Sequence, residues 1–569
     1  MLSHLKSPEN YAANQYQLTG KSIRLFFVNI FNGHTNKTYF QIMKKIIIVL
    51  LAFISTRLVA RDKYWQQYLH FKIDAQLNDQ EKSITGSETI VYKNNSPQTL
   101  TYIWFHLYPN AYKDESTALF QQIKNDTDRK DKLKDYVPGF INRIAFTVNG
   151  NTAKIEPHPN PEYTDIIKVL LAVPLRPGDS VTIATPFKVQ LPSYFSRSGY
   201  EDGEFMACQW YPKPAVFDKD GWHEMPYLDM GEFYSEYASY SVSITVPSEY
   251  IVGATGVLQT PSEMNAYKTA GSYNTAHRGN NPQLYQVVAA EPTKTLSYYA
   301  DSVPDFAWFA DKDFVIEYDT LQLPSGKIIN AFTYYHNHKN TLWQKSIDYV
   351  KDAVRHYGSW IGEFDYPVVQ AVEGPKNNSS GGMEYPTITL ITSPDAKAET
   401  LDAVIAHEVG HNWFMSMLGT NERDHAWMDE GLNSYFEFRY EAEKYRTNAV
   451  FGDQIPADIK KLSQQDFQAT VYLQLTQIPI HPAMETTSAQ FKNDEDYSLT
   501  VYVKPAEWIY ILETKIGTAK VDSAFHNYFD EWKFKHPQPA DMKSAFEEAL
   551  HLDLASYFAL LNKEDKLSE

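Results

Sequence analysis

The 569-residue sequence predicts a multidomain α+β protein in which an antiparallel β domain precedes a mostly helical domain. Three observations support this prediction. The chain is longer than a single hydrophobic core usually supports. Apolar and polar residues alternate with a period of two from about residue 64 to residue 300, and helical spacing dominates from about residue 340 onward.

Two-residue alternation defines the predicted β domain, residues 61–305. The pattern is clearest at residues 69–77 and 240–246, where every second residue is apolar. Such alternation is typical of strands with one buried face. The sequences Asn-Asn-Ser-Pro at 94–97 and Pro-Gly-Asp at 177–179 predict turns between strands.

The predicted helical domain, residues 306–569, begins with an apolar stripe that has Gly358 at the expected C-cap position. The stripe recurs at three- and four-residue spacing and consists of Trp343, Ile347, Val350, Val354 and Tyr357. A later apolar stripe is bounded by Pro505, the expected first helical residue, and by Gly517, the expected C-cap.

Composition and charge narrow the range of functions. Hydrophobic residues make up 43% of the chain, which is enough to form large cores. The formal net charge is −18 and no block rich in Lys and Arg occurs, so we expect no nucleic-acid partner. Cys208 is the only cysteine, which excludes an intrachain disulfide and a cysteine-based metal site.

The N-terminal region predicts export. Met43 and two lysines at 44–45 precede an apolar run at 46–54 and a small-residue cleavage site at 58–60, as in a secretory signal peptide. We therefore interpret residues 43–60 as the signal peptide and residues 1–42 as a non-native leader or a wrongly assigned start. The apolar run is too short to span a bilayer, so we expect a periplasmic or secreted protein with no stable membrane span in the mature chain.

An HExxH motif predicts a metal centre. His407 and His411 lie four residues apart, which places both imidazoles on one face of a helix, and Glu408 lies between them. Zinc accepts three protein ligands and one water in a tetrahedral site. A third histidine six residues after His411 is absent because that position is Met417, so we expect a carboxylate ligand from a following helix, at Glu430.

The segment that contains Glu430 resembles the gluzincin aminopeptidases, the family of membrane alanyl aminopeptidase and leukotriene hydrolase, and suggests a bacterial exported member. Eighteen residues separate His411 from Glu430, which lies in a Trp-Met-Asp-Glu-Gly run at 427–431. The resemblance implies a thermolysin-like zinc metallopeptidase domain with one Zn²⁺ bound by His407, His411 and Glu430, and Glu408 as general base. Two roles stay open for Glu437: it orients a ligand histidine, or it is a solvated helix residue.

A second motif implies an exopeptidase. Gly381, Gly382, Met383 and Glu384 resemble the Gly-x-Met-Glu-Asn motif of the family, with Tyr385 in place of Asn. The resemblance implies an edge strand that binds substrate, in which the glutamate holds the free α-amine of a peptide. It also implies a second amine contact from the β domain, for which Gln209 is the candidate.

The expected oxyanion donor is Tyr502, which resembles the tyrosine of the family's Tyr-Glu-Lys-Gly run and is followed by Lys504; Tyr497 is the rival. The predicted function is hydrolysis of the N-terminal peptide bond of peptides with a free N-terminus. A zinc endopeptidase and a non-catalytic scaffold on the same fold stay open as alternatives. A lipid epoxide hydrolase is a further activity in one branch of the family, and no residue specifically indicates it.

Overall fold

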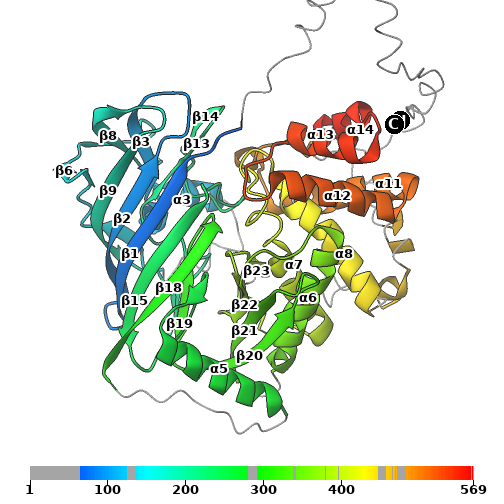
Figure 1. The fold of residues 1–569 in the computed structure, drawn as a ribbon, viewed down its shortest axis with the longest axis horizontal. Coiled ribbons are helices and arrows are strands. Elements are labelled where there is room, and N and C mark those ends of the chain that lie inside the picture. Colours follow the sequence, from blue (N-terminus) through cyan, green and yellow to red (C-terminus); the bar gives the residue numbers. More distant parts are fainter. Residues whose placement is uncertain are drawn as a thin grey trace, which may run out of the picture. The chain divides into compact units, whose positions relative to one another are not determined.

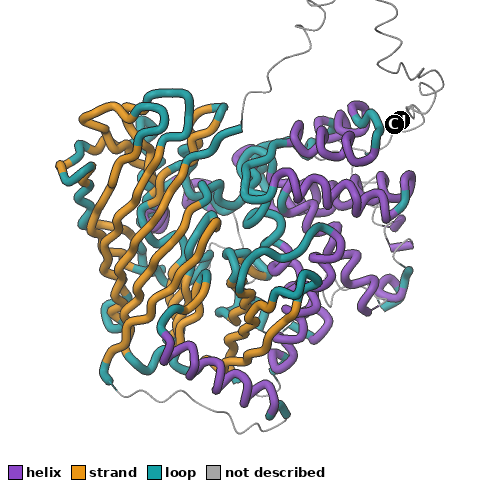
Figure 2. The backbone as a smooth tube through the Cα atoms, in the orientation of Figure 1, coloured by secondary structure: helices purple, strands orange, loops and turns teal. Residues whose placement is uncertain are grey.

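The computed structural model describes residues 64–564 and Leu567, with gaps at 125–135, 280–290, 338–340, 378–379, 395, 446–456, 464–465, 468 and 471–481. The predicted leader and signal peptide lie outside the described residues. Figures 1 and 2 show a β-rich N-terminal half and a C-terminal half that carries most of the helices, as the sequence predicted. Among the described residues, no helix has both the length and the apolar character needed to cross a bilayer.

The N-terminal half is built on a nine-stranded sheet with the order β17-β18-β15-β1-β2-β9-β5-β6, in which β4 also pairs with β9. Inward-facing residues of β1 such as Phe71 and Ile73 are fully buried, which confirms the predicted alternation. One pair, β1 with β15, is parallel, so the sheet is not purely antiparallel. The strands are β1 (Tyr68–Asn78), β2 (Ser83–Lys93), β4 (Phe140–Asn142), β5 (Thr147–Val148), β6 (Asn151–Thr152), β9 (Ser180–Gln190), β15 (Ala238–Pro247), β17 (Val257–Leu258) and β18 (Thr293–Val303).

Smaller sheets complete this half. One has the order β12-β3-β8-β7, a second has the order β10-β11-β19-β16, and β13 pairs with β14. Their strands are β3 (Leu100–His106), β7 (Ile155–Pro157), β8 (Ile166–Leu175), β10 (Gly199–Glu201), β11 (Glu204–Ala207), β12 (Lys213–Pro214), β13 (Val216–Asp218), β14 (Gly221–His223), β16 (Ile251–Ala254) and β19 (Trp308–Asp311), and the helices are α3 (Ala118–Ile123) and α5 (Pro261–Ala276). The domain boundary at 305/306 stays a prediction.

The second half opens with a five-stranded sheet of order β20-β21-β22-β24-β23. It consists of β20 (Phe314–Gln322), β21 (Ile328–His336), β22 (Val368–Glu373), β23 (Gly382–Met383) and β24 (Ile388–Ile391). Periodicity did not predict the strands after residue 340. The reason is that β22 is buried at all six positions, so its sequence carries no polar alternation.

Helices form most of the remainder of this half. They are α6 (Ser346–Trp360), α7 (Ala398–Gly410), α8 (Glu430–Tyr445), α10 (Asp494–Ser498), α11 (Lys504–Ile516), α12 (Thr518–Trp532), α13 (Pro539–Leu550) and α14 (Ala555–Phe558), with a π-helical turn at Leu499–Val503. The predicted stripe of α6 is buried. Gly358 is not the C-cap as predicted, because the helix continues to Trp360, whereas Gly517 does end α11 with a φ of 89°.

A buried ion pair joins the two halves. His536, which follows α12, places Nε2 2.9 Å from Glu236 Oε1 and Nδ1 2.7 Å from the carbonyl oxygen of Gly419. Both partners are acceptors, so both ring nitrogens donate and the imidazole is protonated. Burial opposes this charge, but the Glu236 carboxylate outweighs it and raises the pKa of His536 above its usual 6.5.

We expect His536→Ala to lower the free energy of unfolding by about 3 kcal/mol at pH 6, because Glu236 is left buried without its cation. A raised folded-state pKa stabilises the fold below pH 6.5, and this contribution is lost as the pH rises through the folded pKa. The difference in free energy of unfolding between wild type and variant, measured by urea unfolding, should therefore be smaller at pH 9 than at pH 6. An equal difference at both values would contradict the assigned charge.

Candidate metal centre

Two helices supply the expected ligands. His407 lies in the last turn of α7, His411 follows as its C-cap, and Glu430 begins α8. The helices approach closely because α7 ends in Gly410. A Cβ there would lie 2.1 Å from Asn433 Oδ1 on α8. A side chain at this position would thus push the two helices, and the ligands they carry, apart.

The three donor atoms surround one point. The Nε2 atoms of His407 and His411 are 3.1 Å apart, and they lie 3.3 Å and 3.2 Å from Glu430 Oε2. Donors of a tetrahedral zinc ion with bonds of about 2.0–2.1 Å are separated by about 3.3–3.4 Å. The observed triangle therefore has the size that a zinc ion requires, and it leaves one side open to the pocket.

Carboxylates behind the histidines fix their orientation. His407 Nδ1 donates to Glu437 Oε2 at 2.9 Å, and His411 Nδ1 donates to Asp429 Oδ1 at 2.6 Å. With Nδ1 protonated, each neutral imidazole presents the lone pair of Nε2 to the shared point. Glu437 is buried as well, which favours its ligand-orienting role over the solvated reading. Sequence reasoning missed Asp429, although it lies inside the Trp-Met-Asp-Glu-Gly run.

The charges around the shared point favour binding of a cation. Burial by itself lowers the pKa of His407, but the carboxylates of Glu437 and Glu430 raise it to about 10. Asp429 and Glu430 likewise outweigh burial and raise the pKa of His411. In the absence of another cation the carboxylates thus hold protons on both rings. A divalent metal at this point would displace the proton from each Nε2 and leave both Nδ1 protons in place, and the imidazole and carboxylate donor set suits zinc.

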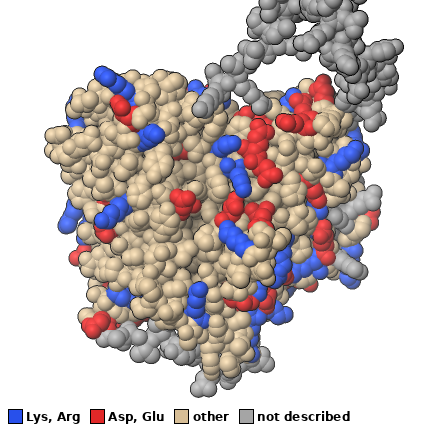
Figure 3. Space-filling model, in the orientation of Figure 1, with Lys and Arg blue, Asp and Glu red and all other residues tan. Residues whose placement is uncertain are grey.

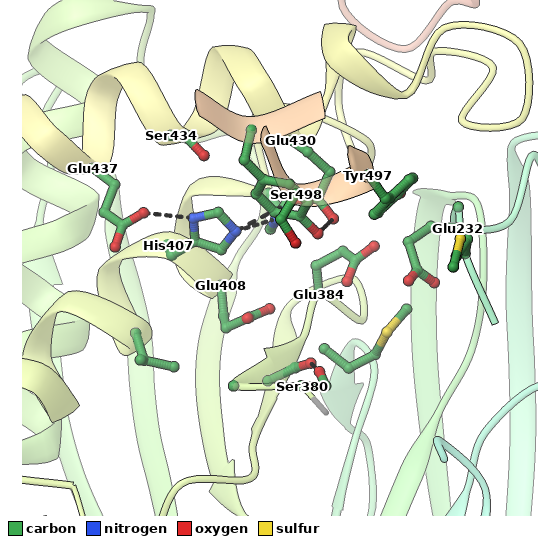
Figure 4. A pocket seen from close by; sticks show the side chains of 18 of the residues that line it. Glu232, Ser380, Glu384, His407, Glu408, Glu430, Ser434, Glu437, Tyr497 and Ser498 are labelled. Carbon is green, nitrogen blue, oxygen red and sulfur yellow. Dashed lines mark hydrogen bonds and ion pairs between the residues drawn. The ribbon is translucent and has the colours of Figure 1, made fainter. Parts of the chain in front are cut away.

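Glu408 lies beside the triad with one free oxygen. Its carboxyl group is buried, its Oε2 has no hydrogen-bond partner, and burial raises its pKa to about 7. A carboxylate with a pKa near neutrality can both accept and return a proton. In Figure 4 it faces the same space as the ring of His407, while Glu437 lies on the other side of that ring.

Gly382 of β23 makes room for Glu408. A Cβ at this position would lie 2.5 Å from Glu408 Oε1, closer than real Cβ atoms approach another atom. Any side chain at residue 382 would therefore displace the carboxylate, whereas Gly381 has only an ordinary contact with Val404.

We expect Gly382→Ala to lower kcat by roughly 10-fold or more, since general bases contribute about 10²–10⁴-fold and depend on position. The bound metal and the melting temperature should stay close to those of the wild type, because the displaced group is the flexible end of a side chain. Gly381→Ala is the matched control and should be nearly neutral. A kcat equal to that of the wild type would show that Glu408 does not need this space.

Glu384 lies next to the triad on its open side. It follows β23 directly, is buried, and has no hydrogen-bond partner for Oε1. Burial raises its pKa well above the usual value, and the nearby Glu232 adds to this effect. Oxygens of Glu384, Glu408 and a nitrogen of His411 lie within 4.8 Å of one another. A buried carboxylate without a partner is a binding site for a cationic group.

Tyr502 reaches the metal ligand from a π-helical turn. Its hydroxyl donates to Glu430 Oε1 at 2.6 Å, and Tyr497, one turn earlier, also lines the pocket. The turn approaches α8 because residue 431 is glycine. A Cβ on Gly431 would lie 2.4 Å from Pro505 Cβ and 2.6 Å from the carbonyl oxygen of Val501. Wide turns of this type frequently occur at functional sites.

Gln209 lies outside this group. Its Oε1 accepts a hydrogen bond from Tyr385 at 3.0 Å, and its Nε2 donates to Asp305 at 3.3 Å. It does not line the pocket, which has a volume of about 400 Å³ and is lined by the other predicted site residues. Two further residues of the pocket wall, Arg197 and Glu232, come from the N-terminal half and carried no sequence signal.

The site defines a class of protein. Two imidazoles and one carboxylate around a shared point, with a buried glutamate between the histidines in sequence, form the arrangement that is typical of HExxH metal sites. Residues 347–560 match the Peptidase family M1 domain. The match confirms the resemblance found in the sequence for this part of the chain.

Relatives support this assignment. The chain is 30% identical to leucine aminopeptidase 2 of Yarrowia lipolytica over a segment that covers 28% of this chain and 25% of the relative. It is 23% identical to glutamyl aminopeptidase of Bos taurus over a segment that covers 42% of this chain and 25% of the relative. It therefore spans only about a quarter of these relatives. A mutant M1 zinc metallopeptidase from Deinococcus radiodurans, bound to a Tyr-Ser-Ala substrate, has the same fold, with a TM-score of 0.59, 15% identity, and coverage of 89% of this chain and 96% of that chain.

Proposed function

We propose that the protein is a zinc aminopeptidase that removes the N-terminal residue of peptides with a free N-terminus. One observation carries this proposal: the buried, unpartnered carboxylate of Glu384 lies beside the open side of the metal triad. An α-ammonium bound to Glu384 would place the first peptide carbonyl of a substrate next to the metal. An endopeptidase has no need for such a carboxylate.

Each residue of the site has a separate role in the proposed reaction. His407, His411 and Glu430 would hold a zinc ion, which would supply the Lewis acid that polarises the carbonyl and acidifies water. Glu408 accepts the proton of the attacking water and returns it to the leaving amine. The hydroxyl of Tyr502 turns from Glu430 to donate to the developing oxyanion. Asp429 and Glu437 keep the two imidazoles in the orientation that the metal requires.

The finer fold class belongs to this proposal. We infer a thermolysin-like catalytic domain, in which the mixed sheet β20–β24 carries the substrate edge strand β23 and packs against α7. The support is the order of the elements: sheet, metal helix α7, and then α8 with the third ligand. The N-terminal β half contributes Arg197 and Glu232 to the pocket wall.

The proposal predicts that free and blocked peptides are treated differently. Wild-type protein should hydrolyse aminoacyl amides and free peptides and reject the same molecules after N-acetylation, because the acetyl group removes the cation that Glu384 binds. A chelator should abolish the hydrolysis. Cleavage of both forms would favour the zinc endopeptidase, and cleavage of neither, with zinc bound, would favour a non-catalytic scaffold.

We also propose that the protein is exported to the periplasm or the medium. The support is the order of basic, apolar and small residues at 43–60. N-terminal sequencing of the native protein should find a start near Arg61. An intact 1–42 segment in an extracytoplasmic fraction would refute the proposal.

The mixed surface charge agrees with an exported enzyme as well as with other classes of protein. On the face shown in Figure 3, acidic and basic side chains are interspersed, mostly over the helical half. Surface charge of this kind therefore adds no support to the proposed compartment, and the signal-peptide pattern carries it by itself.

A further inference from the structure

A further buried carboxyl group lies behind the metal triad. Glu422, in the connection between α7 and α8, is fully buried, and its side chain is hydrogen-bonded to that of Asp429. Asp429 is fully buried as well, and its Oδ1 accepts the Nδ1–H of His411 at 2.6 Å. Glu422 does not line the pocket, so it can act on the metal centre only through Asp429.

Two oxygens of this carboxyl pair lack a donor. Glu422 Oε2 and Asp429 Oδ2 are both buried, and no N–H or O–H group of the described residues donates to either atom. An ionised carboxylate only accepts hydrogen bonds, so two ionised groups cannot form the bond that joins the pair. One proton held by the pair supplies the missing donor and satisfies both oxygens at once.

The surroundings of the two groups assign this proton to Glu422. Asp429 already accepts the Nδ1–H of His411, and a hydrogen bond to the ionised form favours that form. The donor that Glu422 receives is the neutral hydroxyl of Thr420, 3.2 Å from Oε1. Burial, and after it the charge of Asp429, raises the pKa of Glu422 well above its usual value. Glu422 is therefore the neutral acid of the pair, and Asp429 is the carboxylate.

The backbone around Glu422 is fixed by contacts that do not involve its side chain. Asn421 Oδ1 accepts the backbone N–H groups of Arg423 at 3.0 Å and Asp424 at 3.3 Å. The carbonyl oxygen of Glu422 accepts a hydrogen bond from Ser488 Oγ at 2.9 Å. A substitution of the Glu422 side chain should thus leave the course of this connection unchanged.

We infer that Glu422 is a positioning residue of the metal centre: as a neutral acid it donates a hydrogen bond to Asp429, and Asp429 in turn orients His411. This inference rests on the proposed zinc aminopeptidase function. Without the bond, Asp429 Oδ2 would be a buried oxygen with no donor, and the carboxylate could turn away from His411. The metal ligand would then lose the orientation that favours zinc binding.

The test compares glutamine with leucine at position 422. The amide of Glu422→Gln can donate to Asp429 and accept from Thr420, so its Kd for zinc and its kcat on an aminoacyl-4-nitroanilide should stay within about 3-fold of wild type. Glu422→Leu is similar in size but has no donor. Its Kd for zinc should rise by about 10-fold, the lower end of the cost of losing a partner behind a metal ligand. Chelator competition with the metal-free protein measures both values, and Glu422→Met is a second variant without a donor.

A double-mutant cycle shows whether Glu422 acts through Asp429. Asp429→Ala by itself should weaken zinc binding by about 10- to 100-fold. Adding Glu422→Leu to it should cause no further loss, because the group that Glu422 holds is already absent. The matched control is Glu88→Leu, since Glu88 of β2 is another buried glutamate with oxygens that lack a partner among the described residues. It should leave the Kd for zinc unchanged, and the melting temperature reports stability separately.

Two results would overturn the inference. In one, Glu422→Gln loses as much zinc affinity as Glu422→Leu, which would show that the site needs an ionised carboxylate. In the other, Glu422→Leu binds zinc as tightly as wild type, even if its melting temperature falls, or weakens binding further in the Asp429→Ala background. A wild-type protein that binds zinc but cleaves none of the anilides would instead refute the proposed function, while the zinc affinities would still test the role of Glu422.

Discussion

Replacing Glu408 with glutamine should lower kcat by roughly 10²–10⁴-fold, the contribution usual for a general base, while one zinc ion stays bound. Glutamine has the size of glutamate, so it fits beside Gly382, but it cannot accept the proton of the attacking water. Its oxygen and nitrogen also do not contact the metal donors directly. KM should therefore change little, and the loss should appear almost entirely in kcat.

Glu399→Gln is the matched control for this variant, because Glu399 is an exposed residue near the start of the same helix, α7. It should retain full activity. Metal analysis of Glu408→Gln should give the wild-type ratio of zinc to protein. Substantial activity in a protein that holds zinc would rule out Glu408 as the base.

Tyr502→Phe should lower kcat by roughly 10²–10³-fold, the cost of removing one oxyanion donor. The hydroxyl lies 2.6 Å from Glu430 Oε1, so it is close enough to the metal to reach an oxyanion formed there. Phenylalanine keeps the ring that stacks near His407, and the fold of the π-helical turn should persist. Steady-state kinetics at saturating substrate give the effect directly.

Tyr497→Phe is the comparison that decides between the two tyrosines. Tyr497 lines the same pocket, but no hydrogen bond links it to the triad in the described residues. We expect it to change kcat by less than about 10-fold, as a contact outside the transition state does. If the large loss occurs in Tyr497→Phe and not in Tyr502→Phe, the donor role belongs to Tyr497.

Local spacing explains why the sequence predicted the metal ligands. A four-residue interval on one helix places His407 and His411 together whatever the rest of the fold does. Glu430 was predictable because its interval from His411 and its Trp-Met-Asp-Glu-Gly setting are distinctive. Glu384 and Tyr502 were found through motifs in the same way, and the structure places both beside the triad.

Tertiary contacts explain what the sequence did not predict. Glu232 and Arg197 come from long connections without regular structure, and their place in the pocket depends on how the two halves pack. Gln209 lies in the expected segment, but its amide is bonded to Tyr385 and Asp305 instead of facing the pocket. The burial of β22 on both faces removed the alternation that would have revealed the second sheet.

The central claim is that His407, His411 and Glu430 hold one zinc ion, and anomalous diffraction at the zinc absorption edge tests it most directly. A crystal of the purified protein should show a single strong peak about 2.0–2.2 Å from both Nε2 atoms and the nearest Glu430 oxygen. The peak should vanish in Glu430→Ala. A peak at another place, or a zinc-free triad in crystals of active protein, would contradict the account.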